Sequence, residues 1–560
     1  MWAHLIYQNN IIIFMKKNNK SFFTFSIFLL ISVCFINKTY SQNKRKPNIL
    51  FIAVDDLKPE LGCFGNKLIK TPNIDKLASK GSLFKQNYCQ QAVCGPTRAS
   101  IMTGMRPDYT RVWDLKTKMR DMNPDILSLP QYLISQGYTT QGIGKIYDVR
   151  CVDKELDKPS WSVPYYKVDK SYYSVQTGLP ALNYYQNPET KKLAEIYLKE
   201  ATEKGLKGED AITEALKKLK PSNECADVPD NAYTDGANAL EACDILKKLS
   251  KSTDPFFFAV GFSKPHLPFV SPKKYWDLYN RNDMPLAVYQ QPAKNSVDIA
   301  YHNSGELRAY TDIISPIPIS EDSVGITLSV DKQKEMIHGY YAAVSYTDAQ
   351  IGLLLKTLDS LGLADNTIIV LWGDHGWHLG DHNLWCKHTD FEQATHTPLI
   401  IHAPWISHSV INSPTEFVDI FPTLCDLVNA KIPSTLDGKS LTGVMKNPTL
   451  PFKEYAVSQY PRSGPTAETE RLGYASAKYM GYSIRTKQYR YTMWLKDKFR
   501  TYDSFDESKI YGTELYDYKK DPNETVNVVN EKKYAAISKQ LKSKMILYFN
   551  NQEEKLKNKK

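Results

Sequence analysis

Two nearly continuous apolar runs, each followed by acidic residues, constrain the fold of this chain more than any other feature. Asn48–Val54 is followed by Asp55–Asp56, and Thr367–Trp372 is followed by Gly373–His375. Apolar runs of strand length suit strands that are buried on both faces, as in a parallel sheet covered by helices. Because open α/β sheets bind ligands beyond the carboxyl ends of their strands, we expect the two acidic ends to meet in one crevice.

The alternation of strands and helices extends over residues 47–440. Phe256–Val260 is a third apolar run of strand length. Apolar residues at helical spacing predict a covering helix with a core stripe: Tyr341, Val344, Ile351, Leu355 and Leu358. We therefore predict an α/β fold with a large doubly wound mixed sheet flanked by helices. The polar, Lys-rich segment 147–254 is expected to be an insertion near the mouth of the site.

The sequence pattern changes after residue 446, at the turn signal Asn447-Pro448. Tyr479–Thr486 and Tyr489–Trp494 alternate like antiparallel strands joined by a turn, and an amphipathic helix follows at 534–548. This predicts a main domain at 42–446 and a smaller α+β domain at 447–550, with a short antiparallel sheet and one helix. The Lys-rich tail at 551–560 is expected to be disordered.

Residues 1–41 have the architecture of a signal peptide. Lys16, Lys17 and Lys20 precede the apolar run Phe22–Ile36, and small residues follow at the cleavage position. The run is short for a membrane span, and no other stretch looks transmembrane. We therefore expect an exported protein, periplasmic or secreted, without a membrane span. The formal net charge of +10 on 560 residues is spread along the chain, which argues against nucleic-acid binding.

Cys94 has the most informative context of the nine cysteines. It opens the segment Cys94–Arg98 (Cys-Gly-Pro-Thr-Arg), and proline suits the first turn of a helix. Cys94 is therefore predicted at a helix start with Arg98 one turn further on, where an anion would bind. Such a cysteine is a thiolate of lowered pKa, the precursor of another group, or an ordinary buried thiol. The others, apart from Cys34 in the signal peptide, are odd in number and allow one or two disulfides.

Cys-x-Pro-x-Arg, here Cys94, Pro96 and Arg98, resembles the signature of the formylglycine-dependent sulfatases. The resemblance runs from about residue 47 to about residue 530. It implies that a maturing enzyme oxidises Cys94 to formylglycine (3-oxoalanine), whose hydrate attacks the sulfur of a sulfate ester. It also implies one metal ion, expected to be Ca²⁺ rather than Mg²⁺. The implied metal ligands are Asp55, Asp56, Cys94, Asp374 and His375.

The same resemblance assigns catalytic side chains elsewhere in the chain. Lys264–His266 (Lys-Pro-His) follows the third apolar run, and in the family this histidine, here His266, protonates the leaving oxygen. Lys387 matches the late sulfate-binding lysine of the family. Together with Arg98, Lys145 and Lys264, it would neutralise the charge that develops on the sulfate.

Several segments resemble the iduronate-2-sulfatase branch of the family, namely Thr103–Asp108, Arg111–Asp114 and Gly376–Gly380. At the last place of Gly144–Asp148 that branch has histidine, whereas this chain has Asp148. A carboxylate close to a uronate would be repelled by on the order of a few kcal/mol, which favours a neutral sugar. The candidate substrate-binding residues are Asp148, Arg111 and His378.

We therefore predict an exported sulfatase that acts on sulfated carbohydrates, specifically oligosaccharides derived from polysaccharides. A uronate 2-O-sulfate of heparin- or chondroitin-type chains and a neutral sugar sulfate of algal polysaccharides such as ulvan or fucoidan are alternatives. A metal-dependent phosphatase or phosphodiesterase of the same fold is a more distant alternative. The complete set of predicted site residues argues against a non-catalytic glycan-binding protein.

Overall fold

A mixed sheet of eight strands is the central element of the structure, a computed structural model that describes residues 45–165, 167–174, 185–315, 324–463, 477–496 and 504–557. The strand order is β11-β2-β10-β7-β1-β5-β3, with β12 beside β2. The strands are β1 (Asn48–Val54), β2 (Ser82–Tyr88), β3 (Thr139–Gly144), β5 (Phe256–Phe262), β7 (Thr367–Gly373), β10 (His396–His402), β11 (Ser409–Ile411) and β12 (Thr415–Glu416). The three apolar runs form β1, β5 and β7, so the predicted mixed α/β sheet is confirmed.

Four parallel strands of this sheet end at the same edge. β1 lies between β5 and β7 and runs parallel to both. Val54, the last residue of β1, is paired with Phe262 and with Gly373. Gly144 at the end of β3 is paired with Gly261 of β5. The residues that follow these four strands therefore leave the sheet side by side.

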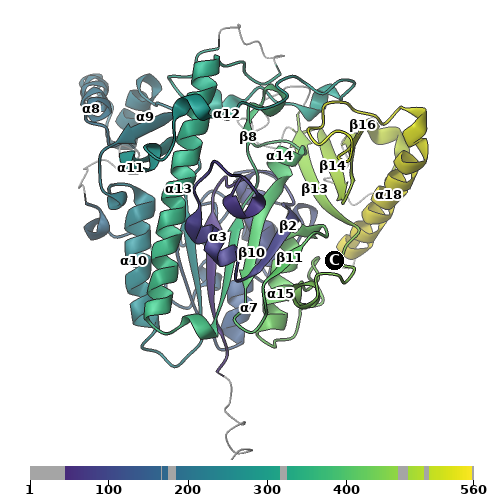
Figure 1. Cartoon of the computed structure of the whole chain (residues 1–560), viewed down its shortest axis with the longest axis horizontal. Coiled ribbons are helices and arrows are strands. Elements are labelled where there is room, and N and C mark those ends of the chain that lie inside the picture. Colours follow the sequence, from purple (N-terminus) through teal and green to yellow (C-terminus); the bar gives the residue numbers. More distant parts are fainter. Residues whose placement is uncertain are drawn as a thin grey trace, which may run out of the picture. The chain divides into compact units, whose positions relative to one another are not determined.

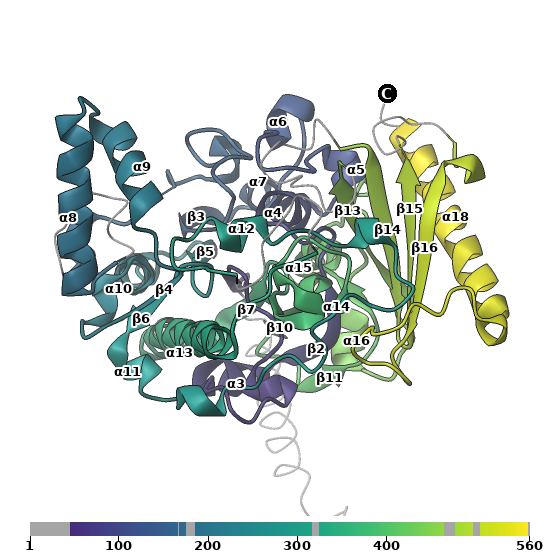
Figure 2. The same ribbon diagram turned by 90° about the horizontal axis from the view of Figure 1, so that it is seen from above.

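Helices cover both faces of the sheet, as a doubly wound fold requires. Alternate residues of β1 enter two separate cores: Leu50, Ile52 and Val54 the first, and Ile49, Phe51 and Ala53 the second. The first core includes α3 (Pro72–Ala78), α10 (Thr234–Leu249) and α13 (Val330–Ser360). The second includes α4 (Cys94–Thr103), α7 (Leu129–Ser135), α15 (Ile420–Leu427) and α16 (Thr442–Lys446). Figure 2 shows α3 and α13 on one side of β7 and β10, with α4 and α7 on the other.

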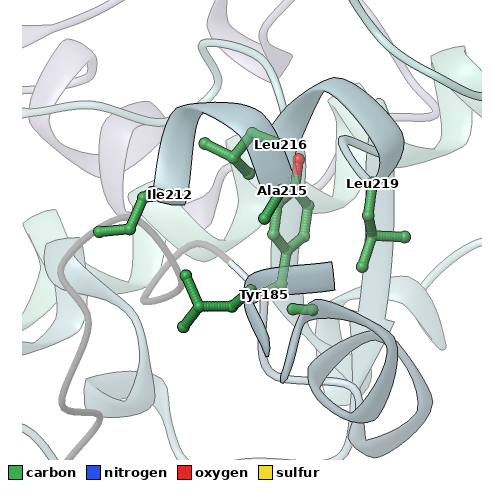
Figure 3. A pocket seen from close by; sticks show the side chains of 7 residues that line it. Tyr185, Ile212, Ala215, Leu216 and Leu219 are labelled. Atoms are coloured by element: carbon green, nitrogen blue, oxygen red, sulfur yellow. The ribbon is translucent and has the colours of Figure 1, made fainter. Parts of the chain in front are cut away.

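Part of segment 147–254 belongs to the first core, which corrects our expectation of an insertion. α10 buries Ala239, Ala242 and Leu246 in that core because they form one apolar face of the helix. α8 (Pro188–Glu203) and α9 (Gly208–Lys218) pack against each other further along the same segment (Figure 1). The cavity between them, shown in Figure 3, has a volume of about 10 Å³ and a lining of Tyr185, Ala194, Leu198, Ile212, Ala215, Leu216 and Leu219. An apolar space this small is not a substrate site.

The C-terminal part is a second, antiparallel sheet with a helix on one face (Figure 1). Its strands, in spatial order, are β13 (Tyr455–Arg462), β14 (Tyr479–Thr486), β15 (Tyr489–Lys496) and β16 (Ile510–Asp517). The predicted hairpin is β14–β15. The helix, α18 (Ala535–Lys557), buries Leu541, Met545 and Tyr548 against the sheet. The predicted smaller α+β fold is therefore confirmed.

Residues 551–557 of the tail are helical, which corrects our expectation of disorder for this part of the tail. α18 continues through this segment, where Leu556 is 9% exposed. Lys555 Nζ lies 2.7 Å from Asp437 Oδ1. One buried apolar contact and one ion pair thus hold the last turn of the helix to the main body.

Shorter elements connect these layers. They are α5 (Pro107–Thr110), α6 (Met119–Met122), α11 (Lys273–Trp276), α12 (Gly305–Arg308), α14 (Glu392–Thr395), and two small sheets, β4 (Asn223–Ala226) with β6 (Phe269–Pro272) and β8 (His378–Leu379) with β9 (Trp385–Cys386).

The predicted signal peptide at 1–41 lies outside the described residues. Within the described ranges, no helix has the length and apolarity needed to cross a membrane. The cysteines of the described part are free thiols, so neither of the disulfides that the sequence allowed forms there.

Glu416, at the end of β12, joins the two sheets. Its Oε1 accepts a hydrogen bond from Val457 N of β13 at 2.9 Å and lies 2.7 Å from Arg106 Nη2. Lys453 Nζ donates to Oε2 at 2.6 Å. Burial disfavours the charged carboxylate, but Arg106 and Lys453 outweigh it and lower the pKa of Glu416 to about 2.

Glu416→Gln should therefore lower the free energy of unfolding at pH 7 by about 3–5 kcal/mol, because a buried cation loses its partner. A lowered pKa means that this stabilisation is present above the unfolded-state pKa of about 4.3 and is lost as the pH falls below it. Urea unfolding at pH 7 and at pH 3 should thus show a smaller difference between parent and variant at pH 3. Glu454→Gln, which removes an exposed partner of Lys544, is the control and should leave stability nearly unchanged. Equal losses in the two variants would contradict the assignment.

Candidate active site

The carboxyl ends of β1 and β7 bring the predicted acidic ligands together. Asp55 and Asp56 follow β1, and Asp374 and His375 follow β7. Hydrogen bonds tie the two ends to each other: Asp374 N donates to Val54 O at 3.3 Å, and Asp56 N donates to Asp374 Oδ1 at 2.9 Å. All four side chains are fully buried. The two acidic strand ends therefore meet, as the two apolar runs predicted.

Cys94 reaches these residues as the first residue of α4. Its Sγ lies 3.3 Å from Asp55 Oδ1 and 3.4 Å from His375 Nε2. The helix begins here because Val93 is extended and its carbonyl accepts a hydrogen bond from Thr97 N at 3.2 Å. Burial, and then Asp55, raise the pKa of the Cys94 thiol well above its usual value. This shift is opposite to that of a reactive thiolate. Below, Asp55, Asp56, Cys94, Asp374 and His375 are called the Cys94 cluster.

The donor set of the Cys94 cluster fits a divalent cation. Ligand atoms within 4.8 Å of one another form two overlapping groups, Asp55, Cys94, Asp374 and His375, and Asp55, Asp56, Cys94 and His266. His375 Nδ1 lies 3.0 Å from Gly376 O, so Nδ1 carries the hydrogen and Nε2 presents its lone pair to the cluster. Burial and the neighbouring Asp55 raise the pKa of Asp374 to about 7. A bound cation would relieve this repulsion between buried carboxylates.

Arg98 holds the Cys94 cluster together. Its Nε donates to Asp374 Oδ2 at 3.0 Å, and its Nη2 donates to Asp55 Oδ1 at 3.0 Å. Its Nη1 donates to the carbonyl oxygens of Lys145 and Ile146. The side chain is fully buried. We expected Arg98 to neutralise the sulfate, but its contacts instead describe a residue that positions two carboxylates.

Lys145 and Lys387 each place an ammonium group beside a carboxylate of the Cys94 cluster. Lys145 Nζ binds Asp55 Oδ2 and lies 4.0 Å from Cys94 Sγ, and its side chain is 24% exposed. Lys387 Nζ lies 3.1 Å from Asp56 Oδ2. Gly144 permits the turn before Lys145: its φ is +78°, and a Cβ there would lie 2.0 Å from Gly261 O. Both lysines are thus placed where the sequence predicted them.

Lys264 forms hydrogen bonds within the loop that follows β5, and its ammonium group also interacts electrostatically with Asp55 and Asp56 of the Cys94 cluster. Its Nζ donates to His266 O at 2.6 Å and to Pro268 O at 2.7 Å. Its backbone N donates to Asp235 Oδ2 at 2.7 Å. These contacts shape the loop that carries His266, and the expected role of Lys264 in neutralising the sulfate stays a prediction.

His266 is partly exposed at the edge of the Cys94 cluster, with 27% of its side-chain area accessible. Nδ1 lies 2.6 Å from Leu267 O, so Nε2 is the ring atom that faces the site. Nε2 lies 3.3 Å from Glu306 Oε1 and 3.8 Å from Asp56 Oδ2. Burial, and then Lys387 and Lys145, lower the pKa of His266 to about 3, while Asp55 and then Glu306 oppose this shift. Of these two carboxylates, Glu306 lies 3.3 Å from Nε2, so a proton on Nε2 depends partly on Glu306.

Glu306 is a site residue that sequence reasoning missed. Its Oε1 accepts from Lys387 Nζ at 2.9 Å, and its Oε2 lies 2.9 Å from His388 Nε2. His388 Nδ1 lies 2.8 Å from the Tyr460 hydroxyl of β13, which connects the C-terminal sheet to the site. Glu306 belongs to the four-residue helix α12 in an irregular stretch, so neither a periodic pattern nor a strand end marked it.

Asp148 is paired with a cation, so its carboxylate does not repel a uronate as we expected from the sequence. Arg150 Nε donates to Asp148 Oδ1 at 2.9 Å, and Arg150 Nη2 donates to Asp148 Oδ2 at 2.7 Å. Asp148 is 3% exposed, whereas the Arg150 side chain is 53% exposed. A substrate therefore meets a guanidinium before it meets the carboxylate. The spacing of Asp148 and Arg150, two positions apart in the sequence, is the one local signal for this ion pair.

The described contacts of the other two candidate substrate residues, His378 and Arg111, are with residues outside the Cys94 cluster. His378 is fully buried, and its Nε2 lies 2.9 Å from Thr389 Oγ1, so a substrate at the surface does not meet it. The guanidinium of Arg111 lies 5.4 Å from the centre of the Trp113 ring. Asp108 and Tyr482 are the charged groups that act on the pKa of Arg111, after burial.

Comparisons with known proteins agree with this site. The sulfatase family profile matches residues 47–430, and that of the N-sulphoglucosamine sulphohydrolase C-terminal domain matches residues 380–551. Human iduronate 2-sulfatase is 33% identical over 545 residues, covering 86% of this chain and 91% of that protein. The ulvan-active sulfatase of Formosa agariphila is 26% identical over 475 residues, covering 81% of this chain and 74% of that protein.

A solved structure shares the fold. It is that of a protein in complex with its substrate D-glucosamine-2-N,6-O-disulfate, with a TM-score of 0.65 at 21% identity, covering 92% of this chain and 98% of that chain. Since one family profile matches more than half of the sequence and a relative above 30% identity spans most of it, this chain belongs to the sulfatase family and is a sulfuric ester hydrolase.

Proposed function

We propose that this protein is exported and releases sulfate from oligosaccharides derived from a sulfated polysaccharide. The observation that carries the proposal is the position of Cys94 at the start of α4, in contact with Asp55 and His375 and 4.0 Å from Lys145 Nζ. Export rests on the basic and apolar pattern of residues 1–41.

Conversion of residue 94 to formylglycine would supply a nucleophilic hydroxyl at sulfur, and Ca²⁺ on the Cys94 cluster would lower the pKa of that hydroxyl and draw charge from the sulfate. The protein's own side chains supply the remaining steps. Lys145 and Lys387 offset negative charge as it moves from the sulfur to the leaving oxygen. His266, with Nε2 facing the site, holds a proton for that oxygen, and Glu306 stabilises it there.

The sugar is the finer part of the proposal. Relatives include proteins named iduronate 2-sulfatase and ulvan-active sulfatase, so uronate and algal substrates both have precedents. The pairing of Asp148 with Arg150 removes the main objection to a uronate. We therefore favour an acidic sugar sulfate over a neutral one.

The first prediction about the proposed function is that residue 94 of the mature protein is formylglycine. Peptide mass spectrometry of protein made in a host with a sulfatase-maturing enzyme should find the aldehyde or its hydrate in place of the thiol. Cys94→Ala should abolish turnover without loss of the folded state, measured by circular dichroism. Full activity of protein that carries only the thiol would refute the prediction.

The second prediction is that the parent protein retains one Ca²⁺ per chain. Asp374→Asn should abolish retention and lower activity by more than about 100-fold, because one ligand charge is lost. Bound calcium is measured by elemental analysis, and the thermal stabilisation by added Ca²⁺ should disappear in the variant. Asp312→Asn, which removes a partner of Lys332, is the control and should retain calcium. Unchanged activity after exhaustive chelation would count against the site.

The third prediction concerns Glu306. Glu306→Gln should lower kcat on a sugar sulfate by about 100-fold, because His266 loses the anion that stabilises its proton. Nitrophenyl sulfate has a good leaving group that needs little protonation, so its hydrolysis should fall by less than about 10-fold. Glu335→Gln, which removes another partner of Lys332, is the matched control. An equal fall on both substrates would show that Glu306 does not act through His266.

A further inference from the structure

The turn after β3 carries a cation that the proposed reaction does not use. Arg150 lies at the surface of this turn with 53% of its side chain exposed, and the preceding Val149 is 68% exposed. Asp148, on the inner side, is 3% exposed. The turn therefore exposes the Arg150 guanidinium to solvent, while the Asp148 carboxylate that binds it is buried.

Asp148 binds only one edge of the planar guanidinium group of Arg150. Nε and Nη2 each donate to one carboxylate oxygen, at 2.9 and 2.7 Å, and the Arg150 backbone N donates to Oδ1 at 3.0 Å. Nη1 has no hydrogen-bond partner among the described residues. The Nη1–Nη2 edge is therefore open, and this is the geometry in which arginine receives a carboxylate or sulfate through two parallel hydrogen bonds.

The turn lies against the start of α4. A Cβ on Gly95, the residue after Cys94, would lie 2.5 Å from Cys151 Sγ, so the two segments are in direct contact. After Asp148 itself, Cys94 is among the groups that act on the pKa of Arg150. Lys145, which precedes the turn, contacts Cys94 from the same strand end. Arg150 is thus part of the surface next to the reacting residue.

We propose that Arg150, positioned by Asp148, binds a second anionic group of the substrate, a uronate carboxylate or a further sulfate. This rests on the proposed function and narrows its substrate class to sugars with two anionic groups. Asp148 contributes by orientation: its two oxygens fix the plane of the guanidinium, and the paired carboxylate no longer repels the substrate. Loss of Arg150 should therefore weaken the binding of doubly anionic substrates and leave a singly sulfated neutral sugar unaffected.

The test measures KM and kcat of matured protein on a uronate 2-sulfate, a disulfated hexosamine and a monosulfated neutral sugar. Arg150→Gln should raise KM for the first two by about 10- to 100-fold with kcat nearly unchanged, and should not alter either constant for the third. Arg150→Lys keeps the charge without the fork and should give an intermediate KM. Whichever of the first two substrates loses more identifies the source of the second anion.

Two further variants separate the proposal from a folding defect. Arg150→Gln leaves Asp148 buried and unpaired, so the double variant D148N/R150Q removes both charges and should reproduce the same substrate-dependent change. Arg281→Gln is the matched control, because Arg281 is 51% exposed and lies 4.0 Å from Glu335. It should change KM for none of the substrates.

The outcomes distinguish the two levels of the proposal. Suppose that the parent hydrolyses these substrates but Arg150→Gln and the double variant change all KM values equally, or change none. Arg150 then does not bind a second anionic group of the substrate. The proposed function would stand in that case. If the matured parent releases sulfate from none of the three, the proposed function fails, and the inference fails with it.

Discussion

Burial of negative charge at the ends of two strands is the constraint on which the rest of the structure depends. Asp55, Asp56 and Asp374 are fully buried. Unpaired charges cannot be held in such a place, so each carboxylate needs a partner from elsewhere in the chain. Arg98 of α4 binds two of them, and Lys387 binds Asp56. The sheet, α4 and the loop after β9 therefore depend on one another for their positions.

The C-terminal sheet takes part in this arrangement. Ser458 Oγ and Gln459 N of β13 donate to the carbonyl oxygens of Cys89 and Gln90, in the loop that leads to Cys94. Tyr460 continues the line toward Glu306 through His388. The second sheet thus supports both the loop before Cys94 and the Glu306 carboxylate beside His266, which gives a physical reason for the two sheets to occur in one chain.

Exposure divides the cations near the site into two kinds. Arg98 and Lys264 are buried and donate hydrogen bonds to carboxylates and carbonyl oxygens of the protein. Lys145 and Arg150 keep part of their side chains accessible, at 24% and 53%. A basic residue in a family motif can therefore act on the substrate or on the scaffold, and only its hydrogen-bond partners tell which.

By itself, the sequence determined the buried parallel strands, the meeting of their acidic ends and the helix start at Cys94. These follow from local patterns, namely apolar runs, residues at strand ends and a proline in a first helical turn. Only the tertiary structure decided the hydrogen-bond partners of Arg98, Glu306 and Arg150. Glu306 and Lys387 are 81 residues apart, and such a contact leaves no periodic trace in the sequence. The orientation of a guanidinium likewise depends on which carboxylates the fold brings within reach. Packing and charge balance across the whole chain determine those positions, and a local sequence pattern does not contain them.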